Sequence, residues 1–245
     1  MAQDILKMEG ITKIYPNGVM ANKDVDFSVR EGEIHALMGE NGAGKSTLMK
    51  ILFGSESYDT GSIWFNGQKL EQRGPAGMIE LGIGMVHQHF MLVDSLRVFE
   101  NIILGIEPTR GIVINSASAI TRVHEMGEKY NLRVDPMAQV GDLSVGLKQK
   151  VELLKVLIRG AKLLILDEYL LFPLKESEAR DLLEIVEARH KVASTIFCSQ
   201  FAVAGWYAKI GEPTLADAIC DRIVHNSYTI KIDGDSMRKR KGISE

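Results

Sequence analysis

Nine consecutive residues of this 245-residue chain have the types and the spacing of a loop that binds phosphate groups. The stretch matches the pattern G-x-x-x-x-G-K-[ST] at every defined position. Its glycines let the backbone turn inward, so that successive N–H groups and the start of the next helix face the phosphates. The residues expected to surround the phosphates are Gly39, Glu40, Asn41, Gly42, Ala43, Gly44, Lys45, Ser46 and Thr47. We therefore predict that the chain binds a nucleoside triphosphate.

Two side chains of this loop have specific chemical roles. Lys45 is expected to reach the β- and γ-phosphates, and the Ser46 hydroxyl is expected to join the coordination of Mg²⁺. A Gly-rich turn that merely opens a helix is the alternative. The apolar run 34–38 predicts a buried strand before the loop, and the spacing over 47–53 predicts a helix after it. This strand–loop–helix order favours the phosphate-binding interpretation.

A second apolar run, residues 163–166, ends in two acidic residues, Asp167 and Glu168. The run predicts a strand that is buried on both faces. At the carboxyl end of a strand near a phosphate loop, Asp167 can hold Mg²⁺ through water. Glu168 can polarise the water that attacks the γ-phosphate. We therefore expect a site that can hydrolyse the nucleotide as well as bind it.

Three polar residues, His87, Gln88 and His89, follow another short apolar run. Two histidines at i and i+2 are a poor metal-ligand set without a nearby carboxylate or cysteine. We expect instead a polar strand end that lines the nucleotide. Tyr15 has a face that could stack on adenine, and an ordinary strand aromatic is the simpler interpretation.

The composition sets limits on the class of protein. A net charge of −3 provides no general attraction to nucleic acid. The basic run 238–241 is local and terminal, so it is either a solvated tail or a nucleic-acid contact. Cys198 and Cys220 lack metal-site or disulfide spacing and are expected to be core thiols. No apolar stretch approaches the roughly 20 residues that span a bilayer, and we expect a cytoplasmic protein.

The order of the expected elements predicts an α/β fold. Residues 6–15 and 25–29 predict two strands around a Pro-Asn-Gly turn, which makes an N-terminal antiparallel part. Helical spacing over about 92–158 predicts a helical insert, whose last helix begins after the N-cap Ser144. The predicted fold is a P-loop NTPase with a mainly parallel sheet flanked by helices, an antiparallel β part and this insert.

Residues 8–168 resemble the ATP-binding subunit of an ABC transporter, in the subgroup that imports sugars and nucleosides. The resemblance rests on the phosphate loop, on Gly-Met-Val-His-Gln-His-Phe and on Leu-Ser-Val-Gly. It implies that the cofactors are ATP and Mg²⁺, that Tyr15 stacks on adenine and that Gln88 senses Mg²⁺ and the lytic water. It also implies a head-to-tail dimer in which Ser144 and Gly146 contact the γ-phosphate of the opposite subunit.

The same resemblance implies a membrane partner. A transmembrane permease is expected to bind the groove of the helical insert beside Gln88. The chain is then expected to lie at the periphery of the inner membrane.

Beyond Glu168 the expected ABC motifs change, and Gln200 stands where ABC ATPases carry a switch histidine. Residues 174–242 resemble the C-terminal half of IstB-like transposition helper ATPases, which are AAA+ relatives of helicase loaders. This resemblance implies that Gln200 orients water, that Arg222 is an arginine finger and that Arg238 is a second sensor arginine. For Arg222 a surface ion pair is the alternative.

We therefore predict a chimera, with an ABC-type core over 1–168 and an IstB-like half over 169–245 that completes the same domain. The phosphate-loop strand and the acidic strand are expected to lie side by side. The predicted function is ATP binding with weak ABC-type hydrolysis, because groups that act from a second subunit are incomplete. The alternatives are a DNA-transposition helper, whose residues 238–241 meet DNA, and an engineered hybrid without a biological partner.

Overall fold

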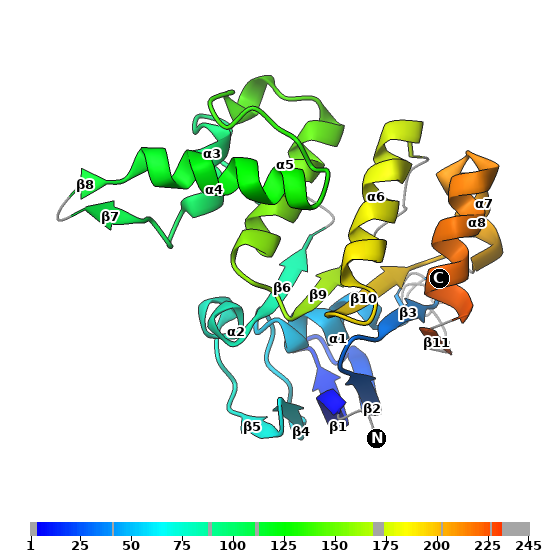
Figure 1. Ribbon diagram of the computed structural model, residues 1–245. Helices are drawn as coiled ribbons and strands as arrows, with labels where there is room; N and C mark the ends of the chain where they lie inside the picture. Colours follow the sequence, from blue (N-terminus) through cyan, green and yellow to red (C-terminus); the bar gives the residue numbers. More distant parts are fainter. Residues whose placement is uncertain are drawn as a thin grey trace, which may run out of the picture.

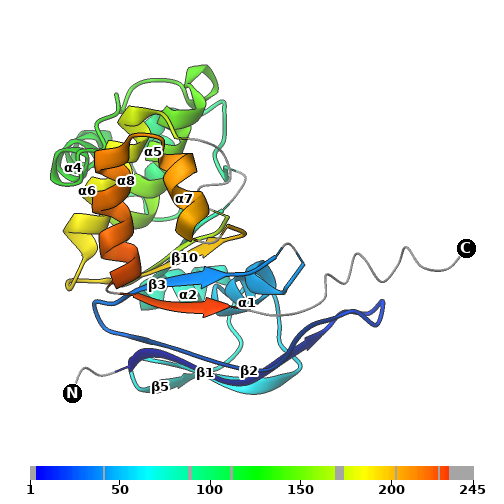
Figure 2. The ribbon, with the colours of Figure 1, turned by 90° about the vertical axis from the view of Figure 1, so that its right-hand side faces the viewer.

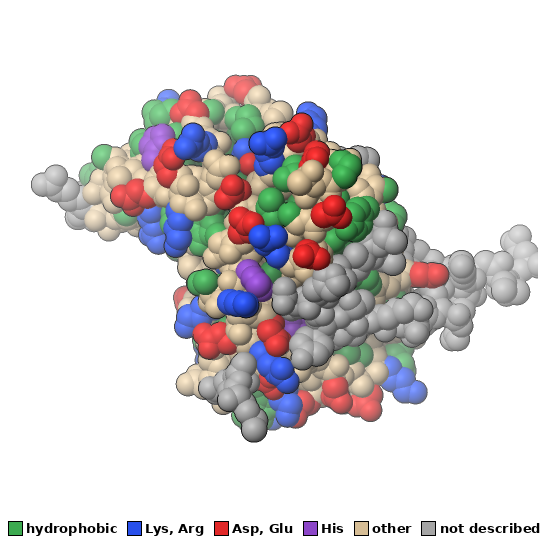
Figure 3. Space-filling view, turned by 45° about the vertical axis from the view of Figure 1, so that its right-hand side comes forward, with side chains coloured by type: hydrophobic (Ala, Val, Ile, Leu, Met, Phe, Trp, Pro, Cys, Tyr) green, Lys and Arg blue, Asp and Glu red, His purple; other side chains and the backbone are tan. Residues whose placement is uncertain are grey.

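The computed structural model describes residues 4–40, 42–87, 90–110, 113–168, 174–201, 203–225 and 227–231. Figures 1 and 2 show three layers: an antiparallel sheet, a parallel sheet above it, and helices over the far face of the parallel sheet. No helix in these ranges is long and apolar enough to cross a membrane. Acidic and basic side chains are interspersed over the face that Figure 3 presents.

The antiparallel sheet is built from the N-terminal strands. Its order is β2-β1-β4-β5, formed by β1 (Asp4–Ile14), β2 (Met20–Arg30), β4 (Thr60–Phe65) and β5 (Gln68–Leu70). Strand β2 starts at Met20, earlier than the predicted residue 25. The residues at this start are mostly polar, so no apolar alternation marks them as a strand in the sequence. The pairing with β1 is also irregular here: Asp24 has a φ of 47°, and the register shifts against β1.

The parallel sheet carries the strands that precede the predicted site. Its order is β11-β3-β10-β9-β6, formed by β3 (Ile34–Met38), β6 (Ile83–Val86), β9 (Leu163–Leu166), β10 (Ser194–Ser199) and β11 (Ser227–Lys231). The predicted bounds of β3 and β9 are confirmed, and β6 is the short apolar run that precedes His87. The prediction that β3 and β9 are neighbours is wrong, because β10 lies between them and pairs with both.

The helical insert is confirmed in part. It contains α3 (Val98–Ile103), α4 (Ser116–Lys129), a 3₁₀ turn (Val140–Asp142) and α5 (Val145–Ile158). The Ser144 hydroxyl accepts a hydrogen bond from the Leu147 amide at 3.4 Å, so the predicted N-cap of α5 is confirmed. A small hairpin, β7 (Thr109–Arg110) and β8 (Val113–Ile114), interrupts the insert and was not predicted. Strands this short leave almost no periodicity in a sequence.

The remaining helices lie on the two faces of the parallel sheet (Figure 1). Between the two sheets lie α1 (Lys45–Leu52) and α2 (Pro75–Leu81). The opposite face carries α6 (Glu176–Arg189), α7 (Val203–Ile210), α8 (Pro213–Cys220) and a π-helical turn (Asp221–His225).

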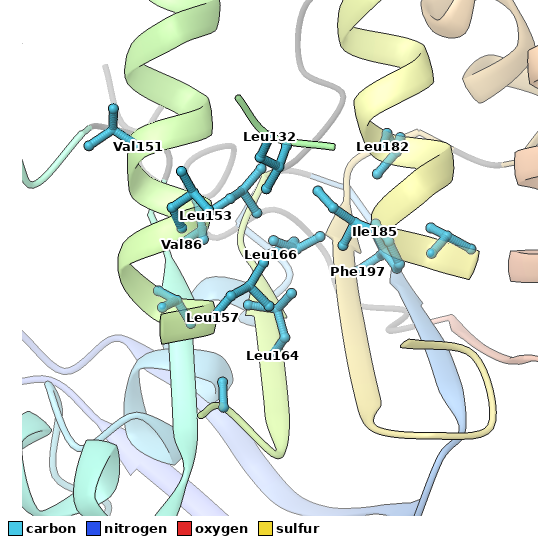
Figure 4. Close-up of a cluster of buried hydrophobic side chains, with 14 of the residues drawn as sticks. Val86, Leu132, Val151, Leu153, Leu157, Leu164, Leu166, Leu182, Ile185 and Phe197 are labelled. Atoms are coloured by element: carbon cyan, nitrogen blue, oxygen red, sulfur yellow. The ribbon is translucent and has the colours of Figure 1, made fainter. Parts of the chain in front are cut away.

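Strand β9 divides the core into two parts. Leu163 and Ile165 pack against the layer that contains α1, whereas Leu164 and Leu166 pack against the layer that contains α5 and α6. Figure 4 shows the second part, where Leu153 and Leu157 of α5 and Leu182 and Ile185 of α6 converge on the sheet, together with Phe197 of β10. A strand buried on both faces is held rigidly, and so are the acidic residues that follow it.

The last residue of α6, Arg189, connects three segments at the amino end of the sheet. Only 3% of Arg189 is exposed, and burial lowers its pKa to about 10. Its guanidinium donates to the Thr195 hydroxyl at 3.0 Å and to the carbonyls of Ser194 at 2.7 Å and Ala161 at 3.0 Å. The planar group therefore connects α6 to the starts of both β9 and β10.

We expect Arg189→Met to lower the free energy of unfolding by at least about 3 kcal/mol, because buried acceptors lose a charged donor. Urea denaturation of both proteins measures this difference. Arg180→Met, on the exposed side of the same helix, is the matched control and should change stability by less than about 0.5 kcal/mol. Equal losses in the two variants would contradict the role of Arg189.

Candidate functional site

The phosphate loop connects β3 to α1, as predicted. Gly42 and Gly44 have φ of 90° and 92°, a region that favours glycine. A Cβ on Gly44 would lie 2.2 Å from the carbonyl oxygen of Ala21 in β2. The loop therefore needs glycine here both for its turn and for its close contact with the antiparallel sheet. Asn41, which is predicted to belong to the loop, lies outside the described residues.

The Lys45 side chain lies inside this loop. Its ammonium donates hydrogen bonds to the carbonyls of Gly39 and Glu40, the latter at 2.9 Å. Only 5% of the residue is exposed, and burial lowers the pKa of Lys45, while the nearby Asp167 and Glu168 oppose this shift. The charged amine is thus held next to the amides of the loop, where phosphate oxygens could replace the two carbonyls.

Ser46 and Asp167 meet although 121 positions separate them. The Ser46 hydroxyl donates to the Asp167 carboxylate at 3.0 Å. Burial raises the pKa of Asp167, and the hydrogen bond from Ser46 opposes this shift. A hydroxyl and a carboxylate oxygen are ligands that suit Mg²⁺, so this pair fits the predicted metal position.

Glu168, the predicted catalytic base, follows Asp167 in a strained conformation. Its φ is 52°, in the left-handed region that residues other than glycine rarely adopt. The residue is half-buried. Strain of this kind often accompanies functional positions, since the surrounding structure must stabilise it.

Tyr15 lies beside the first turn of α1, the helix that follows the phosphate loop. Its hydroxyl is 3.4 Å from the Thr47 hydroxyl, and the ammonium of Lys13 is 5.4 Å from its ring centre. The ring is half-buried, so part of it is accessible for stacking. This position is compatible with both interpretations that the sequence allowed.

Gln200 follows β10, the strand between β3 and β9. The three strands are parallel, so Gln200 leaves the sheet at the same edge as the phosphate loop and the two acids. Two residues earlier, Cys198 is buried, as the sequence predicted, and burial raises its pKa well above the ordinary value. Gln88 and Arg238 lie outside the described residues.

A further residue at this site, Asn22, is identified only by the structure. Asn22 lies in β2, is 4% exposed and donates from its side-chain amide to the Gly44 carbonyl at 3.2 Å. A single polar residue in a strand carries no motif, so only the three-dimensional structure identifies it.

The residues expected to act on a second subunit lie elsewhere on the chain. Ser144 is exposed at the start of α5. A Cβ on Gly146 would lie 2.4 Å from a carboxylate oxygen of Glu178 in α6. Arg222 donates to the Glu187 carboxylate at 2.6 Å, which is the surface ion pair that we gave as the alternative to an arginine finger.

A cavity of about 340 Å³ lies between the helical insert and the core. Its lining is mainly apolar and includes Phe53, Ile79, Met85, Met91 and Val156. Two polar atoms among the lining residues are buried without a hydrogen-bond partner in the described structure: Oε1 of Glu152 and Nε of Arg159. Oε1 of Glu152 lies 3.6 Å from the Lys155 ammonium, which is ion-pair range only.

Two family profiles match the chain. The profile described as ABC transporter matches residues 22–170, and the profile described as IstB-like ATP binding protein matches residues 145–244. The first match covers more than half of the chain, and the two overlap over 145–170. The expected IstB resemblance is therefore present, but the two matches do not meet at a sharp boundary.

Characterised proteins give the same family. The guanosine import ATP-binding protein NupO of Bacillus subtilis is 44% identical over 192 residues, which is 78% of this chain and 37% of that protein. The L-arabinose transport ATP-binding protein AraG of Geobacillus stearothermophilus is 43% identical over 235 residues, 94% of this chain and 44% of that protein. This second alignment extends well past Glu168. The chain thus spans less than half the length of both relatives.

A solved structure supports the fold. The ADP conformation of MJ1267, an ATP-binding cassette of an ABC transporter, superposes with a TM-score of 0.70 at 23% identity and covers 82% of each chain. The predicted fold class is confirmed. The ABC transporter profile, which matches more than half of the chain, shows that the chain belongs to the ABC transporter family.

Proposed function

We propose that this chain is the ATP-binding and ATP-hydrolysing cassette of an importer for a sugar or a nucleoside. The contact between Ser46 and Asp167 is the observation that carries the proposal, because it joins the phosphate loop to the acidic strand. The relatives, which are named for guanosine and L-arabinose transport, support the class of cargo.

The chemistry of the site follows from its own residues. The triphosphate would replace the carbonyls of Gly39 and Glu40 as partners of the Lys45 ammonium. When bound, Mg²⁺ would neutralise charge on the phosphates, held by Ser46 and Asp167. Glu168 would orient and polarise the attacking water. Tyr15, Gln88 and Gln200 are proposed to support the adenine ring and the water; Ser144, Gly146, Arg222 and Arg238 are proposed to act on a second copy.

Lys45→Ala should abolish stabilisation by the nucleotide. Mg·ATP at a hundred times its dissociation constant stabilises a folded protein by about 2.7 kcal/mol, which for this size corresponds to roughly 5–10 °C in melting temperature. We expect this shift in the unmodified chain and in Lys129→Ala, a control at the end of α4. Thermal melts with and without Mg·ATP measure it. Equal shifts in melting temperature in all three proteins would show that Lys45 does not belong to the nucleotide site.

Glu168→Gln should separate binding from hydrolysis. The variant is expected to keep the ATP-induced shift, because the Lys45 and Ser46 contacts remain. Turnover should fall at least a hundredfold, the usual contribution of a general base. Phosphate release at saturating Mg·ATP gives the rate. Turnover at the original rate in this variant would assign the base to another residue.

We also propose that a transmembrane permease docks in the cavity beside α5, at the inner face of the membrane. The apolar lining suits a partner helix. His87, the residue directly before Gln88, is among the residues that line the cavity. Oε1 of Glu152 and Nε of Arg159, which have no hydrogen-bond partner in the described structure, would gain one from that helix. Burial of unsatisfied polar atoms is costly, so docking of a complementary polar group would relieve this cost.

Met91→Asp should prevent this docking. Met91 is 59% exposed at the cavity, and a carboxylate there would be desolvated by an apolar partner. We expect affinity for the detergent-solubilised membrane subunits of a sugar or nucleoside importer to fall at least about tenfold. The ATP-induced melting shift should be unchanged. The control is Val192→Asp, because Val192 is 73% exposed and lies in a different cleft. Weaker binding of the membrane subunits in the Val192→Asp variant alone would refute this docking site.

A role as a DNA-transposition helper is the second candidate, and the IstB-like profile match favours it. The net charge of −3 and the mixed charges in Figure 3 supply no broad basic surface for DNA on the face shown. Arg222 is also engaged by Glu187. The import cassette is therefore the better-supported function, and the chimeric origin and its division at 168/169 stay proposals.

A further inference from the structure

Asn22 is a buried polar residue for which the nucleotide chemistry described above has no use. It lies in β2 opposite Lys13 of β1 and directly against the phosphate loop. Its amide donates to the Gly44 carbonyl at 3.2 Å. A Cβ on Gly44 would lie 2.8 Å from that amide nitrogen, so the strand and the loop are in close contact.

The carbonyl that Asn22 binds is the one that opens α1. The Gly44 oxygen also accepts the first helical hydrogen bond, from the Leu48 amide at 2.9 Å, and no side chain caps this helix. Two donors on one carbonyl fix the plane of the Gly44–Lys45 peptide. Because a trans peptide points its N–H away from its C=O, the Lys45 amide must then point out of the helix start, where phosphate oxygens bind.

Asn22 makes this bond at a cost. Its side-chain oxygen is buried and has no hydrogen-bond partner in the described structure. Leucine would fill a similar volume without leaving an acceptor unsatisfied, so burial alone does not favour asparagine at this position. What asparagine supplies and leucine does not is the N–H donor to the loop.

We infer that Asn22 is a positioning residue for phosphate binding, which orients the Gly44–Lys45 peptide without touching the nucleotide. The inference rests on the proposed nucleotide binding. It makes the antiparallel sheet part of the structure that holds the phosphates.

Two variants test the inference by calorimetric titration with Mg·ATP and with inorganic tripolyphosphate. Asn22→Leu removes the donor and the orphan acceptor together, so the denaturation midpoint should stay within error. Both ligands should bind about 5- to 10-fold more weakly, the effect of one neutral hydrogen bond. Asn22→Asp places a carboxylate against the Gly44 carbonyl and should weaken both ligands more than tenfold.

The controls separate this role from packing and from base recognition. Asn101→Leu, at a buried asparagine whose side-chain amide donates hydrogen bonds to carbonyls of the helical insert, should lower stability and leave both affinities unchanged. Tyr15→Leu should weaken ATP but not tripolyphosphate. Unchanged affinities in Asn22→Leu, or a loss confined to ATP, would overturn the inference. If the unmodified chain binds neither ligand, the proposed function itself fails.

Discussion

The hydrogen bond between Ser46 and Asp167 depends on β10, a strand that contains neither residue and precedes neither of them directly. Ser46 follows β3 and Asp167 follows β9, and β10 lies between these two strands. Cys198 of β10 pairs with Leu37, and Phe197 pairs with Leu166. A one-residue slip of β10 would turn its buried side chains to the wrong face and displace β3 relative to β9. The proposed nucleotide site therefore depends on the C-terminal segment as well as on the phosphate loop.

A second constraint comes from the other side of the loop. The contact between Gly44 and Ala21 leaves no room for a side chain, so the antiparallel sheet sets the path of the loop from below. The parallel sheet sets the positions of the acids from the side. Helix α1 packs between the two sheets, so both sheets restrict the positions of Lys45 and Ser46 at its start. Close packing makes such an arrangement stiff, which suits the proposed role of holding a polyphosphate in one geometry.

The sequence predicted individual buried strands better than it predicted their order in the sheet. Continuous apolar runs bounded by turns marked β3, β6 and β9 correctly, because a strand buried on both faces needs such a run. Strand order is a property of pairing between distant segments, and no local pattern encodes it, so the expected β3–β9 pairing was wrong. The roles of Asn22 and Arg189 could not be predicted for the same reason, because each residue contacts segments that lie far away in the sequence.

Packing also bears on whether the chain divides near residue 168. Helix α6 lies beyond that position, yet Asp181 of this helix pairs with Lys150 of α5 at 2.9 Å, and Arg189 binds the Ala161 carbonyl before β9. Helices α5 and α6 share one apolar core over the sheet (Figure 4). A boundary between independent units would be crossed by few contacts. Here the ion pair of Asp181 with Lys150 and the hydrogen bond of Arg189 to Ala161 both cross position 168, so any joint in the sequence lies within a single physical unit.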